Sequence, residues 1–192
     1  MERQVNAITK ACYYQLRKLG KIRRFLTTDT CRTLVNATIT SRLDYANSLL
    51  YGIPDYLMDR LQKVQNSVAR FIQKTNRRDH ITPVLIHLHW LPVEYRVRYK
   101  IILVTYKAIH GTAPQYISDL INKYQPSRNL RSSTQSLLVI PKTRTSTYGK
   151  RSFRTAAATL WNSIPESVKT IDSLPCFKTH LKTYLFKLAF DL

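Results

Sequence analysis

Glycine is scarce in this sequence, with four among 192 residues. A protein built from β-hairpins needs backbone turns with positive φ every eight to twelve residues or so, and glycine usually supplies them. The scarcity therefore argues against a hairpin-rich sheet fold. Hydrophobic residues make up 44% of the chain, which is enough for a packed core and argues against wholesale disorder. We expect a mainly helical protein.

Cysteines are few and widely spaced: Cys12, Cys31 and Cys176. They form no CxxC pair, so neither a disulfide framework nor a zinc knuckle is indicated. The longest purely aliphatic run, residues 101–104, is far shorter than the ~20 residues of a membrane-spanning helix. We therefore expect an intracellular, reducing location, nucleus or cytoplasm, without a membrane partner. The basic, amphipathic N-terminus leaves a mitochondrial transit peptide as an alternative.

Motifs of common enzyme classes are also missing. The sequence contains no P-loop, HExxH, GxSxG or GxGxxG motif, and its acidic residues are too scattered to indicate a two-metal carboxylate cluster. His80, His87 and His89 are close in sequence, but His87 and His89 would lie on different faces of a helix. We interpret His89 and Trp90 as packing at a corner between helices. The expectation is a chain with no catalytic residue, metal, cofactor or small-molecule substrate.

Acidic residues are outnumbered: 31 Lys and Arg face 11 Asp and Glu, which gives a net charge of +20. Positive charges in such excess repel one another in a compact protein, so a polyanionic partner usually neutralises them. Nucleic-acid phosphate is the commonest such partner and an anionic membrane the next. The composition favours RNA or DNA.

Apolar residues recur at steps of three and four over most of the chain, which predicts an irregular bundle of about seven helices. The clearest stripe runs from Leu57 to Ile72. The expected helices carry the apolar residues between Val5 and Leu19, between Leu34 and Ala46, and over 57–72, 82–88, 93–109, 113–121, from near Tyr148 to Trp161, and between Ser173 and Leu188.

Composition changes near Tyr124, where the chain becomes rich in Ser and Thr. We therefore divide the chain into a helical bundle (1–75), a central helical region (76–123), and a basic loop with C-terminal helices (124–192). Within the loop only residues 136–140 have an extended pattern, and a short β-hairpin near 136–148 is one interpretation.

Between Asp119 and Glu166 there is no acidic residue. Guanidinium groups bind phosphate oxygens in a bidentate fork, and interleaved hydroxyls complete such contacts. Tyr124 and Tyr148 are candidates for stacking on unpaired bases. The alternative is a loop whose charge merely keeps it solvated. We predict nucleic-acid contacts from Arg128, Arg131, Lys142, Arg144, Lys150, Arg151 and Arg154.

A second basic cluster follows the first expected helix and contains Arg17, Lys18, Lys21, Arg23 and Arg24. We predict nucleic-acid contacts here from Arg17, Lys18, Arg23 and Arg24. The alternative is structural, because cations near the C-terminus of a helix stabilise its dipole.

Several longer runs resemble one family. They are SRLDYANSLLYGIP (41–54), LQKVQNSVARFI (61–72), DHITPVLIHLHWLPVEYRVRYKI (79–101), LRSSTQSLLVIPKTRTSTYGKRSF (130–153) and TLWNSIPESVK (159–169). Together they resemble the C-terminal region of the reverse transcriptase of LINE-type non-LTR retrotransposons of the jockey and chicken-repeat kind. One departure is Ala46, where the family commonly has Cys; we interpret this as one small residue replacing another.

The resemblance implies a thumb followed by a C-terminal extension, which together grip template RNA and target DNA. The polymerase aspartates and the endonuclease of that family lie upstream of the matching region, so the chain would carry neither. It also implies that Met1 is an internal methionine of a truncated copy. A full-length reverse transcriptase is then a possible partner. Two alternatives stay open: a helical scaffold for protein interaction, and a remnant without a biochemical role.

Overall fold

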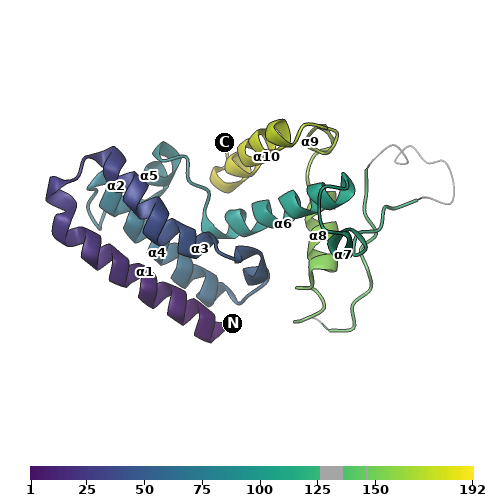
Figure 1. Cartoon of the computed structure of the whole chain (residues 1–192), viewed down its shortest axis with the longest axis horizontal. Helices are drawn as coiled ribbons and strands as arrows, with labels where there is room; N and C mark the ends of the chain where they lie inside the picture. The colour runs from purple at the N-terminus through teal and green to yellow at the C-terminus, as the bar shows by residue number, and fades with distance from the viewer. Residues whose placement is uncertain (126–135, 146) are drawn as a thin grey trace. The chain divides into compact units, whose positions relative to one another are not determined.

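The computed structural model describes residues 1–125, 136–145 and 147–192 (Figure 1). It is mainly helical, as the sequence predicts, and it divides into two compact units. Unit 1 comprises residues 1–96 and 189–192, and unit 2 comprises residues 97–188. The division falls inside one helix, so the central region expected over 76–123 contributes to both units.

Unit 1 begins with α1 (Glu2–Ile22), which ends in a 3₁₀ turn, η1 (Arg23–Phe25). A long bent helical stretch follows, made of α2 (Thr28–Val35), the π-helical segment η2 (Asn36–Thr40) and α3 (Ser41–Asp44). The 3₁₀ turn η3 (Asn47–Leu50) then leads to α4 (Asp55–Gln73) and α5 (Thr82–His87). The helix α6 (Val93–Ile109) starts in unit 1 and continues into unit 2.

The core of unit 1 forms where α1 and the stretch from α2 to α3 pack on α4 (Figure 1). The predicted stripe on α4 is buried, including Leu57, Leu61, Val64, Val68 and Ile72, and it meets Val5, Cys12 and Leu19 of α1. Two helix ends differ from the sequence pattern, in which Gly20 indicated a C-cap or a kink and Ala46 belonged to an apolar helix face. α1 continues through Gly20, and Ala46 is exposed in a left-handed turn (φ 49°) beyond α3 instead of facing the core.

Two glutamines of α4 hold the turn that precedes α6. Gln65 is buried and donates its amide N–H to the Leu91 carbonyl at 2.8 Å, and the Gln62 side-chain oxygen accepts from the Val93 N–H at 2.8 Å. The second contact satisfies one of the first amides of α6, which have no partner within the helix. Trp90 is buried at this corner, as expected, whereas His89 is exposed at φ 53° after α5.

Unit 2 contains the rest of α6, then α7 (Gln115–Ser118), α8 (Phe153–Ser163), α9 (Glu166–Lys169) and α10 (Leu174–Phe190), the last of which ends in unit 1. Its core is aromatic. The ring of Phe177 lies 3.9 Å from that of Tyr106 and 6.2 Å from that of Trp161, measured between centroids. Tyr106 also donates its hydroxyl to the Ile171 carbonyl at 2.9 Å, which ties α6 to the turn before α10.

α8 begins at Phe153 and not near Tyr148, as the sequence indicated. The residues before it are held in turns: the Gly149 N–H donates to the Thr145 hydroxyl at 2.9 Å, and the Ser152 hydroxyl donates to the Gly149 carbonyl at 2.8 Å. These bonds compete with helix formation, as Ser and Thr side chains commonly do. The β-hairpin considered near 136–148 is not formed among the described residues, because 137–139 pair with 122–124 instead.

The thiols give a test of this packing. Cys12 and Cys31 are buried and Cys176 is exposed, and burial raises the pKa of Cys12 to about 11. We therefore expect a thiol reagent at pH 8 to modify only Cys176 in the native protein, and all three cysteines after denaturation. Modification of Cys12 or Cys31 without unfolding would contradict the fold of unit 1. Because the pKa of folded Cys12 lies above its unfolded value, stability is full below about pH 9 and falls as pH rises towards 11.

Candidate nucleic-acid interface

The basic region of unit 2 is attached to the helices by a short paired segment. Lys123 and Leu138 form an antiparallel bridge, in which the Tyr124 N–H donates to Leu137 O and the Val139 N–H donates to Asn122 O, each at 2.9 Å. Leu138 is buried, whereas Lys123 and Tyr124 are exposed. The bridge therefore fixes the chain before and after residues 126–135 at one place on the unit.

Side chains of α8 and α9 hold the returning segment more firmly than the bridge alone. The Asn162 side-chain amide pairs with the backbone of Leu138 as a neighbouring β-strand would. Its oxygen accepts from the Leu138 N–H and its N–H₂ donates to the Leu138 carbonyl, both at 2.9 Å. The Trp161 indole donates to the Ser136 carbonyl at 2.7 Å, and Glu166 accepts from the Ser136 N–H at 3.0 Å. Four hydrogen bonds from three side chains thus hold two backbone positions.

The charge of Glu166 is used within the fold. Burial by itself raises the pKa of this carboxyl, but the Ser136 N–H and Lys169 outweigh burial and hold the pKa below its usual value. Lys169 is buried and lies 3.4 Å from the carboxylate. Since the folded pKa is lowered, this contribution to stability is present at neutral pH and is lost in acid. Glu166, the first acidic residue after Asp119, is thus paired with Lys169.

A compact turn carries the next basic residues. A Cβ added to Gly149 would lie 2.6 Å from the Thr145 carbonyl oxygen and 2.8 Å from the Thr143 Cβ. Only glycine allows this approach without a shift of the backbone. Lys142, Arg144 and Lys150 are exposed around this turn, and Tyr148 is 80% exposed. The turn thus holds cations and a free aromatic ring together.

The structure places the predicted residues of unit 2 as follows. Lys142, Arg144, Lys150 and Arg154 are exposed, and Arg151 is half-buried and engaged in a contact. Tyr124, 49% exposed, belongs to the bridged segment. Arg128 and Arg131 lie outside the described residues.

The second cluster lies on unit 1 and contains exposed Arg17, Lys18, Lys21 and Arg24. Two of these cations lie over aromatic rings: the Lys18 ammonium is 4.7 Å from the Tyr14 ring centroid, and the Arg24 guanidinium carbon is 4.6 Å from that of Phe25. Both rings are exposed, Tyr14 by 53% and Phe25 by 72%. Alternating cations and accessible rings are typical of surfaces that bind unpaired strands.

Arg23 differs from its neighbours, and its position favours the structural alternative. Its guanidinium donates to the Phe71 carbonyl at 3.1 Å, the Leu26 carbonyl at 2.9 Å and the Ile72 carbonyl at 2.8 Å. Two of these are carbonyls of the last turn of α4, which have no partner within the helix. Arg23 therefore caps α4, and we do not include it in the interface.

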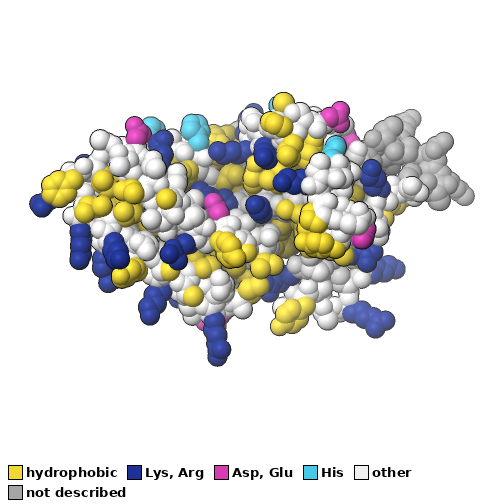
Figure 2. All heavy atoms as spheres, in the orientation of Figure 1, with side chains coloured by type: hydrophobic (Ala, Val, Ile, Leu, Met, Phe, Trp, Pro, Cys, Tyr) yellow, Lys and Arg dark blue, Asp and Glu magenta, His cyan; other side chains and the backbone are white. Residues whose placement is uncertain are grey.

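The basic face of α1 extends further than the cluster predicted from the sequence. Arg3 and Lys10 are exposed, and they precede Arg17 by steps of seven residues, about two turns each. The face opposite to Val5, Cys12 and Leu19 is therefore basic over about 21 Å, and Figure 2 shows dark blue side chains along α1. A signal was present, because the chain has no acidic residue between Glu2 and Asp29.

Other kinds of site have little support in the described residues. There, no three His, Cys, Asp or Glu side chains come together in a way that could hold a metal ion. His110 stacks on Tyr106, and His180 contacts the Cys176 carbonyl one turn earlier in α10. Within residues 1–125, 136–145 and 147–192, no helix has the length and apolar character needed to cross a membrane.

Comparison of the chain with protein-family models, with curated proteins and with solved structures gives no match.

Proposed function

We propose that this chain is a non-catalytic nucleic-acid-binding segment, related to the C-terminal region of a LINE-type reverse transcriptase. It grips RNA or DNA through the basic segment that precedes α8 and through the first turn of α8. The supporting observation is that Lys142, Arg144, Lys150 and Arg154 are exposed on a stretch without acidic residues. The hydrogen bonds of Asn162 and Trp161 anchor this stretch to folded helices, so its cations are attached to an ordered unit.

Electrostatic attraction between these cations and phosphates would drive the binding. Each cation that contacts a phosphate releases a condensed counterion, and this release drives binding at low salt. Carboxylates on the same surface would compete for the cations and repel the phosphates, and this stretch has none between Asp119 and Glu166. The exposed ring of Tyr148 adds a platform on which a base can stack.

The resemblance to the retrotransposon family supports the same proposal from the sequence side. Residues from different runs of the family pattern contact one another in the structure. Asp44 of the first run is paired with Arg96 of the third at 3.0 Å. Gln65 of the second bonds Leu91 of the third, and Asn162 of the fifth bonds Leu138 of the fourth. The runs that carry the resemblance therefore pack on one another within each unit of this chain.

Binding to labelled single-stranded RNA, single-stranded DNA and duplex DNA, measured from about 50 to about 200 mM salt, tests the proposal. We expect the logarithm of the binding constant to fall linearly with the logarithm of salt, by ~0.7–0.9 per phosphate contact. A flat salt response, or no binding at low salt, would overturn it. A polymerase assay should be blank, and activity in that assay would contradict the non-catalytic assignment.

A further inference from the structure

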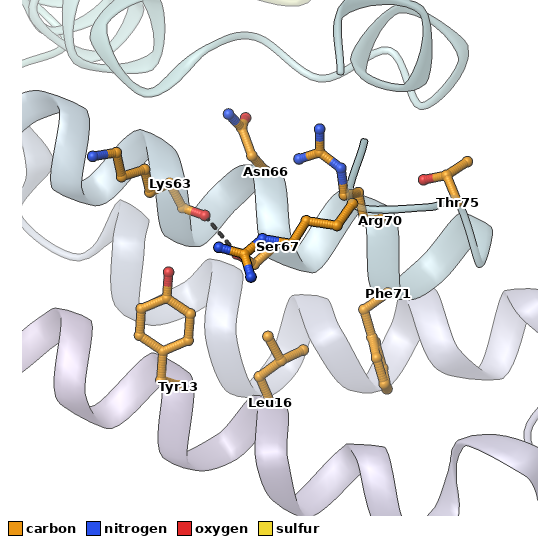
Figure 3. Close-up of a pocket in the computed structure, with 9 residues that line it drawn as sticks. Tyr13, Leu16, Lys63, Asn66, Ser67, Arg70, Phe71 and Thr75 are labelled. Carbon is orange, nitrogen blue, oxygen red and sulfur yellow. Dashed lines mark hydrogen bonds between the residues drawn. The ribbon is translucent and has the colours of Figure 1, made fainter. Parts of the chain in front are cut away.

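Unit 1 has an open groove of about 630 Å³ between α1 and the C-terminal half of α4 (Figure 3). Its volume is in the range of about 300–1,000 Å³ that small-molecule sites occupy. Lys63 and Arg70 line it from α4, Arg77 lines it from the segment that follows, and Tyr13 lines it from α1. Among the described residues that line it, none is acidic.

The cations of the groove are partly fixed in place before any ligand binds. Arg70 donates from Nε to the Asn76 carbonyl at 3.2 Å and from Nη2 to the Asp79 carbonyl at 2.8 Å. These bonds hold the turn that carries Arg77, and the Asp79 carboxylate accepts from the Asn76 N–H within the same turn. A guanidinium has five N–H donors, so two bonds leave Arg70 with further donors. Lys63 and Arg77 are exposed.

Aromatic rings lie beside these cations. Tyr13 is 38% exposed, and Figure 3 shows its hydroxyl directed from α1 towards Lys63 on α4. Phe71 points from α4 towards α1 in the same view, and the Arg23 cap on the Phe71 carbonyl fixes this part of the helix. The groove thus combines cations for a phosphate with rings for a base, which is the chemistry that one unpaired nucleotide requires.

We infer that this groove binds one nucleotide of an unpaired strand, with the phosphate on Lys63, Arg70 and Arg77 and the base against Tyr13. The site lies in unit 1, apart from the basic stretch before α8, and the inference goes beyond the proposed function. Asn66 and Ser67 also line the groove and supply an amide and a hydroxyl for the edge of the base or for the sugar. Stacking tolerates any base, so little base specificity is expected.

The test uses the full chain and a short oligo(dT) carrying 2-aminopurine, whose fluorescence falls when it stacks. We expect K63A/R77A to weaken binding by about tenfold or more, because two of the three phosphate cations are lost. The matched control is K178A/K182A, which removes the same charge from exposed positions of α10. Tyr13→Ala should abolish the fluorescence change, whereas Tyr13→Phe, which keeps the ring, should retain it.

Three outcomes would overturn the inference. In the first, K63A/R77A weakens binding no more than the control pair. In the second, Tyr13→Ala leaves the fluorescence change intact. In the third, inorganic phosphate alone competes as well as a mononucleotide, which would make the groove an anion site without a base subsite. Failure of the proposed function is distinguishable, because replacing Lys142, Arg144, Lys150 and Arg154 with alanine tests that function and leaves the residues of this groove unchanged.

Discussion

Trp161→Ala should lower the free energy of unfolding of unit 2 by about 3–5 kcal/mol, the range found when a large buried aromatic side chain is removed. The indole is 1% exposed and packs on Phe177 in the aromatic core. It also donates to the Ser136 carbonyl, so its loss removes one of the anchors of the segment before α8. We expect nucleic-acid affinity to fall together with stability.

The chain offers an internal control for this measurement. It has two tryptophans, Trp90 buried in unit 1 and Trp161 buried in unit 2. In the Trp161→Ala variant, the remaining fluorescence therefore reports unit 1, while circular dichroism reports both units. Trp161→Phe should have a smaller effect, because it keeps a packed ring, although it loses part of the buried volume and the hydrogen bond to Ser136, the latter worth about 1 kcal/mol. A destabilisation by Trp161→Ala of under about 1 kcal/mol would contradict the described core.

Replacing Lys142, Arg144, Lys150 and Arg154 together with alanine should weaken nucleic-acid binding by on the order of 10²–10³-fold at 0.1 M salt. The salt dependence is the sharper readout. If all four cations contact phosphates, the plot of the logarithm of the binding constant against the logarithm of salt should become less steep. Its slope should decrease by about four times 0.7–0.9. All four side chains are exposed, so we expect unfolding curves close to those of the unmodified protein.

A matched variant separates specific contacts from net charge. Lys100, Lys178, Lys182 and Lys187 are also exposed, and replacing them with alanine removes the same charge from α6 and α10. We expect this control to lower nucleic-acid affinity much less than the variant of the proposed interface does. The salt dependence of binding should stay nearly unchanged. Equal losses in the two variants would show that the protein attracts polyanions by its overall charge, and the proposed interface would be wrong.

The helical architecture was predictable because the apolar spacing on helices such as α4 is strong and local. The exceptions occur at helix ends, where the spacing of apolar residues carries little information. Gly20 indicated a C-cap or a kink, yet α1 continues through it, and a Cβ there would meet nothing within 4 Å, so no close contact requires glycine. The start of α8 was placed too early, because side-chain bonds between Thr145, Gly149 and Ser152 are not visible in a periodic pattern.

The candidate interface was predictable in part, because its charge pattern is also local in the sequence. Absence of acidic residues is a property of sequence, so the stretch before α8 could be recognised directly. The role of Arg23 could not, since its partners Phe71 and Ile72 are almost fifty residues away. Likewise, the groove joins Tyr13 of one helix to Lys63 and Arg77, and only the packing of α1 on α4 brings them together.

Mapping photochemical crosslinks between bound nucleic acid and the chain tests the central claim most directly. The strand is crosslinked at low and high salt, and the modified peptides are identified by mass spectrometry. The proposal predicts crosslinks on the segments that contain Tyr124 and Tyr148, and their loss at high salt together with binding. Tight binding with crosslinks confined to other parts of the chain, such as the exposed face of α10, would contradict it.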